Sequence, residues 1–456
     1  MTTPTFQQLG VASEIASALQ EYGIVRPFAI QELTLPLALD GNDLIGQART
    51  GMGKTLGFGV PLLDRIFDDA DIEELDGSPR ALVVVPTREL CQQVCSDLTR
   101  AAKNLTAFRN GVDDSNGTRP LRVLEIYGGR PYEPQIDALQ RGVDVVVGTP
   151  GRLLDLHQRG DLMLDKVRVL VLDEADEMLD LGFLPDIEKI LQTLPAQRQT
   201  MLFSATMPGP IIALSRNFLH KPVHVHAEAA ESSLMHSAIK QVVFQSHQMD
   251  RIDALSRILQ ADGRGRTIIF CRTKNYTARV AEDLANRGFD VAAVHGDMGQ
   301  GAREASLDAF REGKAEILVA TDVAARGIDI DDVTHVVNVQ VPEDEKTYVH
   351  RIGRTGRAGN SGTAVTMVGW DELHRWRLIS DALELDNPEP PRWFSNSPEL
   401  AEALGIPEDA ESSVGPARKL IGSRPARSSR QSPRHTSRKP ARSARSSRPS
   451  RGARRR

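Results

Sequence analysis

The chain has 456 residues, 40% of them hydrophobic, which suffices for two domains of about 200 residues each. No apolar run approaches the roughly 18 residues of a membrane span. The start, "MTTPTFQQLG", lacks the basic and apolar regions of a signal peptide, so we expect a cytoplasmic protein.

The net charge of −5 conceals a basic tail on an acidic body. Residues 418–456 contain 15 Lys or Arg and no acid, which leaves 41 basic and 61 acidic residues, or −20, for the rest of the chain. This tail is rich in Arg, Ser and Pro and has no aromatic residue. It cannot bury enough apolar surface to fold, so we expect it to be disordered. A basic tail on an acidic body indicates a polyanionic partner.

Cysteine and histidine usage argues against a zinc site or a disulfide framework. The three cysteines, Cys91, Cys95 and Cys271, are an odd and sparse set. Cys91 and Cys95 stand one helical turn apart, but two thiols without further ligands are more typical of core packing. His224 and His226 would share one face of a strand, and they too are too few to hold a metal.

A repeated unit runs through the chain, and each copy has a short apolar run, a polar cluster and a helix-like stretch. Apolar runs separated by helices are typical of parallel strands buried on both faces, with ligands bound beyond the carboxyl ends of the strands. The sequence therefore predicts an α/β fold with two parallel sheets, each covered by helices on both faces. The first series consists of "ALVVVPTREL" (81–90), "VDVVVGTPGR" (143–152), "VLVLDEAD" (169–176) and "TMLFSAT" (200–206). The second series consists of "RTIIFCRT" (266–273), "VAAVHGD" (291–297), "AEILVATD" (315–322) and "THVVNVQ" (334–340).

These two series define the expected domains. The stretch "WDELHRWRLISDALEL" reads as an amphipathic helix packed on the second domain. The segment between this helix and the tail is too short for a separate folded domain. The predicted boundaries are 1–226 for the first domain, 227–239 for a linker, 240–385 for the second domain, 386–417 for an extension and 418–456 for the tail.

Residues 48–55, "ARTGMGKT", have the G-K-T ending of a phosphate-binding loop. In such a loop, backbone amides and the following helix N-terminus cradle phosphates, while Lys54 reaches the β and γ oxygens and Thr55 ligates Mg²⁺. The usual pattern has glycine at its first position, where this chain has Ala48.

The apolar run that begins at Val167 supplies acids that can act together with this phosphate-binding loop, because it ends on Asp173, Glu174 and Asp176. An unpaired carboxylate in a low dielectric costs on the order of several kcal/mol or becomes protonated. In addition to the phosphate-binding loop, nucleotide hydrolysis requires one acid that holds Mg²⁺ and a second acid that activates water. We therefore expect a Mg²⁺-dependent nucleotide-hydrolysing site.

Seven motifs follow one another along the chain: "ARTGMGKT" (48–55), "PTREL" (86–90), "TPGR" (149–152), "DEAD" (173–176), "SAT" (204–206), "ATDVAARGID" (320–329) and "HRIGRTGRAG" (350–359). In these motifs and their order, the sequence resembles the DEAD-box ATP-dependent RNA helicases, over roughly residues 6–370. The absence of the first glycine, at Ala48, is itself a feature of this family. The resemblance implies two RecA-like domains that close together on ATP and single-stranded RNA.

For the nucleotide site, the resemblance implies that Asp173 holds the metal and that Glu174 is the general base for the attacking water. Arg354 and Arg357 match the arginine fingers of the second domain, which reach the γ-phosphate only when the domains close. Further nucleotide contacts are implied for Gln31, Ala48, Thr50, Gly51, Gly53, Lys54, Thr55 and, at the ribose, Asp329. Coupling between the ATP and RNA sites is implied for Ser204, Thr206, Asp176 and His350.

The resemblance also implies a track that grips the RNA backbone. Hydroxyls, glycines and a few arginines do not form a base-reading constellation, so we expect sequence-independent binding, with 2′-hydroxyls distinguishing RNA from DNA. The alternative for these glycines is that they serve backbone geometry alone. The implied contacts are Thr87, Arg88, Gly128, Gly129, Thr149, Gly151 and Arg152 on the first domain, and Thr273, Gln300, Arg303, Thr321 and Asp322 on the second.

Two segments depart from the family pattern. In "YGIVRPFAIQ" (22–31), Ile24 stands where an aromatic residue is usual and Phe28 where a small hydroxyl residue is common, while the adenine-reading Gln31 is present. We expect altered base stacking with retained selectivity for adenine. The polar stretch at 104–122 looks like an inserted loop, for which solvation is the default.

Three functions fit these residues. The first is an RNA-stimulated ATPase that separates short duplexes, the second an ATP-dependent clamp or remodeller of RNA–protein complexes, and the third a DNA translocase with the same core. Glu174, Arg354 and Arg357 favour ATP turnover, and the DEAD form of the acidic motif favours RNA.

Overall fold

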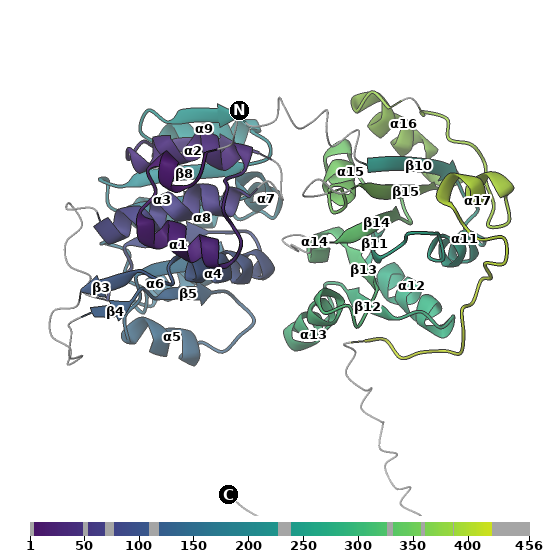
Figure 1. The fold of residues 1–456 in the computed structure, drawn as a ribbon, viewed down its shortest axis with the longest axis horizontal. Helices are drawn as coiled ribbons and strands as arrows, with labels where there is room; N and C mark the ends of the chain where they lie inside the picture. Colours follow the sequence, from purple (N-terminus) through teal and green to yellow (C-terminus); the bar gives the residue numbers. More distant parts are fainter. Residues whose placement is uncertain are drawn as a thin grey trace, which may run out of the picture. The chain divides into compact units, whose positions relative to one another are not determined.

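The computed structural model describes residues 4–48, 53–68, 77–108, 118–226, 239–325, 332–356, 361–385 and 387–421. Its elements form two α/β domains (Figure 1). The expected linker falls outside the described residues except for Ile239, and the tail falls outside them beyond Ile421. None of the helices in the described ranges combines the length and apolar character needed to cross a membrane.

The first domain contains a sheet of parallel strands in the order β5-β6-β2-β7-β8-β1-β9. The four apolar runs of the first sequence series form β2, β6, β7 and β8, whose residues are almost all buried. The strands are β1 (Leu44–Gln47), β2 (Ala81–Val84), β5 (Val123–Ile126), β6 (Val145–Gly148), β7 (Val169–Leu172), β8 (Gln199–Ser204) and β9 (Val223–His226). The helices are η1 (Gln7–Leu9), α1 (Ser13–Glu21), α2 (Ala29–Leu39), α3 (Lys54–Asp68), α4 (Arg88–Ala101), α5 (Glu133–Gln140), α6 (Pro150–Gln158), α7 (Ala175–Asp180), α8 (Leu184–Thr193) and α9 (Gly209–Phe218).

Alternate residues of these strands enter two separate cores. Val83, Val147 and Val171 pack into a cluster with α1 to α4, whereas Leu82, Val146 and Leu170 pack into a cluster with α6, α8 and α9. Because successive side chains of a strand point to opposite faces, this division shows that helices cover both faces of the sheet. The predicted architecture of the first domain is confirmed.

The second domain contains a parallel sheet in the order β10-β15-β14-β11-β13-β12. The second sequence series forms β11, β12, β13 and β14, again buried, and clusters on both faces confirm the same architecture. The strands are β10 (Ile239–Gln245), β11 (Arg266–Cys271), β12 (Val291–Val294), β13 (Ile317–Thr321), β14 (Val333–Asn338) and β15 (Gly362–Val368). The helices are α11 (Arg251–Ile258), α12 (Lys274–Asn286), α13 (Gln300–Arg311), α14 (Asp322–Ala325), α15 (Glu345–Ile352), η2 (Trp370–Glu372), α16 (Leu373–Ala382) and α17 (Pro398–Leu404).

The helix expected after residue 370 packs on the second sheet, as its amphipathic pattern predicts. Trp376 of α16 is completely buried and lies edge-on to the ring of Tyr348 in α15, with ring centroids 5.5 Å apart. Its indole N–H donates to the carbonyl of Asn387 at 2.8 Å, which satisfies the one polar group of a buried tryptophan.

The segment after this helix, residues 387–421, also follows the second domain. Trp393 stacks on Phe244 of β10, with ring centroids 5.7 Å apart. Further along, the amides of Val414 and Arg418 donate to the carbonyls of Arg287 and Ala285 at the end of α12. Ile421 forms a parallel bridge with Ala292 of β12. The packed part of the chain thus continues past the extension predicted at 386–417 and into the first four residues of the predicted tail.

The inserted stretch at 104–122 is not simply a solvated loop. Its ends form the antiparallel strands β3 (Thr106–Phe108) and β4 (Thr118–Pro120), and residues 109–117 lie outside the described ranges. The buried Arg119 donates two hydrogen bonds of 2.6 Å to the carboxylate of Asp144, which lies just before β6. Such a bidentate pair fixes the base of the insertion at the amino end of β6.

Candidate functional site

The strand order of the first sheet arranges the candidate residues along its carboxyl edge. The segments after β5, β6 and β2 carry the residues predicted to contact RNA. The acids follow the central strand β7, the coupling candidates Ser204 and Thr206 lie at the end of β8, and the phosphate loop follows β1. Because all of these strands are parallel, these segments lie at one edge, where α/β sheets bind ligands.

Lys54 and Asp173 meet at the centre of this edge. Lys54 is the first residue of α3, and its Nζ lies 3.9 Å from Oδ1 of Asp173, with both side chains buried. Within the described residues, this buried Nζ has no hydrogen-bond partner. A buried ammonium with unused donors at a helix N-terminus fits a phosphate group.

Asp173 has the character expected of a cation ligand. Burial raises the pKa of its carboxyl group to about 7, and the nearby Lys54 ammonium opposes this rise. A carboxylate that is costly to ionise in isolation gains from a divalent cation, and oxygen is the ligand that Mg²⁺ prefers. The residues present therefore fit a Mg²⁺–nucleotide complex, with Thr55 next to Lys54 at the start of α3.

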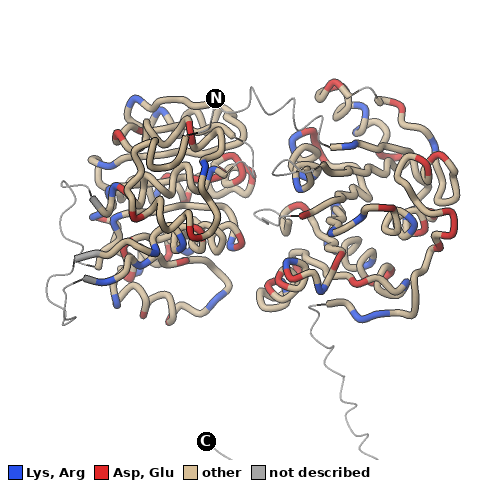
Figure 2. The backbone as a smooth tube through the Cα atoms, viewed as in Figure 1, with Lys and Arg blue, Asp and Glu red and all other residues tan. Residues whose placement is uncertain are grey.

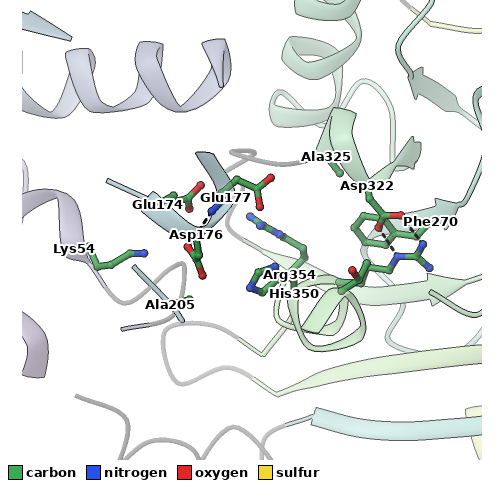
Figure 3. Close-up of a pocket in the computed structure, with 12 residues that line it drawn as sticks. Lys54, Glu174, Asp176, Glu177, Ala205, Phe270, Asp322, Ala325, His350 and Arg354 are labelled. Atoms are coloured by element: carbon green, nitrogen blue, oxygen red, sulfur yellow. Dashed lines mark hydrogen bonds and ion pairs between the residues drawn. The ribbon is translucent and has the colours of Figure 1, made fainter. Parts of the chain in front are cut away.

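Glu174 occupies the sharp turn between β7 and α7. Its φ of 52° and ψ of 51° place it in the left-handed region, which is uncommon for a residue with a side chain and clusters at functional sites. The residue is buried, and its amide donates to Oδ1 of Asp173 at 2.9 Å. Figure 3 shows the side chains of Lys54, Glu174 and Asp176 grouped at this edge of the first domain.

Asp176 links the acidic turn to the segment after β8. Its Oδ2 accepts hydrogen bonds from the amide and the hydroxyl of Thr206, at 2.8 and 2.7 Å. Its amide donates to the hydroxyl of Ser204, which in turn donates to the carbonyl of Thr206. Burial favours the neutral acid, but the hydrogen bonds from Thr206 and Ser204 help hold the pKa of Asp176 below its ordinary value. Three of the four predicted coupling residues thus form one network.

Gln31 is joined to the phosphate loop. Its Nε2 donates to the carbonyl of Gly53 at 2.6 Å, and its Oε1 accepts from the amide of Phe28 at 3.0 Å. Gly53 has a φ of +75°, and a Cβ there would lie 2.5 Å from both Nε2 of Gln31 and the ring of Phe28, so only glycine fits. A carboxamide has two N–H donors and two lone pairs, so Gln31 keeps one of each for an adenine edge.

The candidate RNA contacts of the first domain lie at helix starts and turns. The hydroxyl of Thr87 caps α4 by accepting from the amide of Leu90 at 3.2 Å. Gly129 has a φ of +84°, a left-handed backbone conformation that favours glycine, and it lies against the guanidinium of Arg88. Gly151 has open space around it. Thr149 precedes α6, and the guanidinium of Arg152, in that helix, lies 3.9 Å from the ring centroid of Tyr132.

In the second domain, the candidate RNA contacts follow three adjacent strands. Thr273, after β11, caps α12 by accepting from the amide of Tyr276 at 3.3 Å. Gln300 begins α13, where Arg303 donates to the carbonyl of Ala324 at 3.0 Å. Thr321 ends β13, and Asp322 begins α14. Because β12, β13 and β11 are neighbours in the sheet, these residues can form one continuous track.

Arg351 is a site residue that the motif-based analysis did not assign. It is almost completely buried, and its Nε and Nη2 donate to the two carboxylate oxygens of Asp322 at 2.5 and 2.7 Å. Its Nη1 also donates to Oδ1 of Asn338 and the carbonyl of Gln340. Arg351 therefore fixes Asp322 and the turn at the end of α15, close in sequence to His350 and Arg354. The only sequence signal for it was its place inside "HRIGRTGR".

Four predicted site residues lie outside the described ranges, so their positions are not assigned. They are Thr50 and Gly51 of the phosphate loop, Asp329 and Arg357.

Comparisons with known proteins agree with this geometry. The family model "DEAD/DEAH box helicase" matches residues 28–214, and "Helicase conserved C-terminal domain" matches residues 250–359. The DEAD-box ATP-dependent RNA helicase CshA of Geobacillus kaustophilus is 44% identical over 364 residues, which are 80% of this chain and 73% of the relative. The ATP-dependent RNA helicase DeaD of Mycobacterium tuberculosis is 44% identical over 380 residues, which are 83% of this chain and 63% of the relative.

Solved structures show the same fold. S. cerevisiae Dbp5 bound to RNA and ADP BeF3 superposes with a TM-score of 0.73 at 30% identity, covering 88% of this chain and 99% of that one. The DEAD-box helicase Mss116 bound to ssRNA and UDP-BeF superposes with a TM-score of 0.74 at 26% identity, covering 89% of this chain and 83% of that one.

The two parallel-sheet domains and the phosphate loop with its acidic partner strand define a helicase core of two RecA-like domains. The chain belongs to the DEAD-box family of ATP-dependent RNA helicases.

Proposed function

We propose that the protein is an RNA-stimulated ATPase that uses Mg²⁺-ATP to separate short RNA duplexes or to remodel RNA–protein complexes. The observation that carries the proposal is the hydrogen-bonded network of Asp176, Ser204 and Thr206. This network starts at the acidic turn after β7 and ends on the segment after β8. It joins neighbouring segments of the sheet edge that carries the candidate nucleotide contacts and the candidate RNA contacts. The similarity to bacterial helicases supports the cytoplasm as the compartment.

In the proposed reaction, Lys54 binds the β- and γ-phosphates, and Glu174 accepts a proton from the attacking water. Thr55 and Asp173 are the proposed Mg²⁺ ligands, and the bound cation would neutralise charge on the phosphates. Arg354 and Arg357 stabilise the charge that develops on the γ-phosphate. Because these arginines belong to the second domain and Lys54 to the first, hydrolysis requires the domains to come together.

The RNA track is proposed to act by local contacts with the sugar-phosphate backbone. Figure 2 shows Lys and Arg interspersed with Asp and Glu along the backbone of both domains. Hydroxyls and glycines at the strand ends allow close approach of a backbone, and none of them reads a base edge. RNA binding by the core should therefore show little sequence preference.

A strand-separation assay tests the proposal against the clamp alternative. With Mg²⁺-ATP and a short labelled RNA duplex, the wild-type protein should release the labelled strand at a rate that depends on ATP. ATP-dependent RNA binding without strand release or displacement of a bound protein would instead support a clamp. Strand release from DNA at least as fast as from RNA would support a translocase on DNA.

The geometry of Gln31 leads to a prediction about the base of the nucleotide. A carboxamide can pair with N6 and N7 of adenine, whereas guanine presents acceptors at both O6 and N7, so one hydrogen bond is lost. We expect kcat/KM for ATP to exceed that for GTP by about tenfold or more, despite the loss of an aromatic residue at Ile24. The measurement is steady-state hydrolysis of each nucleotide at saturating RNA, and equal values would contradict the proposed role of Gln31.

The basic tail is proposed to tether RNA near the core. Thirteen of its fifteen Lys and Arg residues lie at 422–456, beyond the packed segment, and these cations should bind RNA by releasing counterions, an effect that is independent of sequence and falls steeply with salt. Deleting residues 422–456, which leaves the packed segment through Ile421 intact, should weaken RNA affinity at low salt and flatten the slope of log K against log salt. The kcat at saturating RNA should stay nearly the same. An unaltered salt slope would show that the tail does not touch RNA in the complex.

A further inference from the structure

The second sheet has a pocket at its carboxyl edge that none of the roles above uses. The candidate RNA contacts follow β12, β13 and β11, which make up one half of the strand order. The other half, β14, β15 and β10, ends at a pocket of about 420 Å³ that also reaches the end of β11. Pockets of roughly 300–1,000 Å³ are typical of small-molecule sites. All of the described residues that line this pocket belong to the second domain.

The floor of the pocket is a closed polar network. Arg251 is buried and donates from Nη2 to Glu372 at 2.7 Å and from Nε to the hydroxyl of Ser246 at 3.1 Å. The amide of Gly369 also donates to Glu372, at 2.9 Å. A buried arginine paired in this way keeps its geometry, so the floor is a fixed surface. Because the charge of Arg251 is paired with that of Glu372, the floor offers little net charge to a ligand.

Arg272 supplies an available donor at the wall of the pocket. Its side chain is 29% exposed, and its buried Nε has no hydrogen-bond partner among the described residues. Its Nη2 lies 3.8 Å from the exposed Glu343, a separation that allows only a weak surface ion pair. The guanidinium is partly exposed and only weakly paired through Nη2, so a phosphate oxygen of an incoming ligand can compete with Glu343 for it.

Trp370 supplies an aromatic face. The residue is 56% exposed, unlike the fully buried Trp376 a few residues later. The guanidinium of Arg392 lies over its ring, 4.7 Å from the centroid, so the ring is held on one side by a cation. An exposed indole with an arginine on one face is the chemistry on which single-stranded nucleic acids stack their bases.

We propose that this pocket binds one further nucleotide of the RNA strand, with its base on Trp370 and its phosphate near Arg272. The inference rests on the proposed RNA-binding function. The position of the pocket supports this inference, because Arg272 directly precedes Thr273, the candidate RNA contact at the end of β11. The carboxyl edge thus continues from the RNA track into the pocket. RNA is favoured over a peptide because the lining other than Trp370 and Gly369 is polar or charged and offers no apolar groove.

Tryptophan emission tests the proposal directly. The chain has three tryptophans, of which Trp376 is buried and Trp393 is stacked on Phe244. Single-stranded RNAs from about 4 to about 16 nucleotides, spanning common single-strand site sizes, are titrated into the full chain with a non-hydrolysable ATP analogue at fixed salt. We expect quenching only above a threshold length, and loss of that quenching in Trp370→Phe, which keeps an aromatic ring but removes the reporter.

Affinity provides the second readout. Trp370→Ala should weaken binding of RNAs above the threshold length by about tenfold, and leave shorter RNAs unaffected. Trp370→Phe should retain most of the affinity. Phe394→Ala is the matched control, because Phe394 is an equally exposed aromatic residue of the same domain outside the pocket, and it should not change the length dependence.

The outcomes separate this inference from the proposed function. If RNA stimulates hydrolysis but Trp370 emission never responds and Trp370→Ala binds long RNA within twofold of wild type, the pocket is not an RNA subsite and the proposed function stands. If the wild-type protein does not bind RNA of any length, both the inference about the pocket and the proposed function are overturned.

Discussion

Replacing Glu174 by Gln should lower ATP turnover at saturating RNA by about 10² or more, because an amide cannot accept the proton of the attacking water. The exchange preserves the shape of the side chain at a buried position with a left-handed backbone. Binding of Mg²⁺-ATP and of RNA should therefore be retained. The measurements are kcat in steady state and nucleotide affinity by equilibrium titration.

Lys54→Ala is the contrasting variant for this prediction. It removes the buried ammonium beside Asp173, so nucleotide binding itself should weaken. A Glu174→Gln protein that turns over ATP within a factor of three of wild type would remove Glu174 from the role of general base.

Arg354→Gln should reduce kcat by about 10³, the lower end of the range for arginine fingers, because the guanidinium stabilises charge that appears only in the transition state. Nucleotide affinity should change much less than kcat. The matched control is Arg377→Gln on α16 of the same domain, where Arg377 is exposed and pairs with Glu389. This control variant should hydrolyse ATP at the wild-type rate.

The result that would contradict this assignment is a loss of RNA or nucleotide binding equal to the loss of kcat in Arg354→Gln. Such a pattern would mean that Arg354 supports the ground state or the fold. Arg351→Gln illustrates that other pattern, since Arg351 is buried and holds Asp322 and Asn338 in place.

Most of the fold could be predicted from sequence because the central strands are short, apolar and buried on both faces. β2, β6 and β7 each have four consecutive buried residues, and each is followed by a polar segment. β5 was not singled out, because it is an edge strand whose first three residues are only partly buried and which includes Glu125. β1 is equally short and ends on Gln47, so its apolar run is too brief to stand out.

The residues of the candidate site likewise divide into those that the sequence predicts and those that only the folded chain reveals. Lys54 and the acids of β7 were predictable, because a phosphate loop and an acidic strand end have local signatures. The link between Arg119 and Asp144 was not, since it joins a polar loop to a residue 25 positions later. Likewise, the preference for glycine at position 129 comes from its φ of +84°, a backbone conformation that only the folded chain shows. Long-range side-chain pairs of this kind leave no periodic trace in a sequence.

The C-terminal boundary shows a third limit of sequence reasoning. Residues 387–421 have no long periodic apolar pattern, yet Leu400 and Leu404 are buried against the second sheet. Isolated apolar residues in an irregular segment can be assigned to a core only when the surface that they cover is known.

The measurement that tests the central claim most directly is ATP hydrolysis by the wild-type protein with Mg²⁺, in the presence of single-stranded RNA, of DNA of the same sequence, or of neither. We expect RNA to raise kcat well above the other two conditions, because contacts along the RNA backbone depend on the 2′-hydroxyls and couple to the acidic turn through Asp176 and Thr206. Equal rates in all three conditions, or stimulation by DNA as strong as that by RNA, would contradict it.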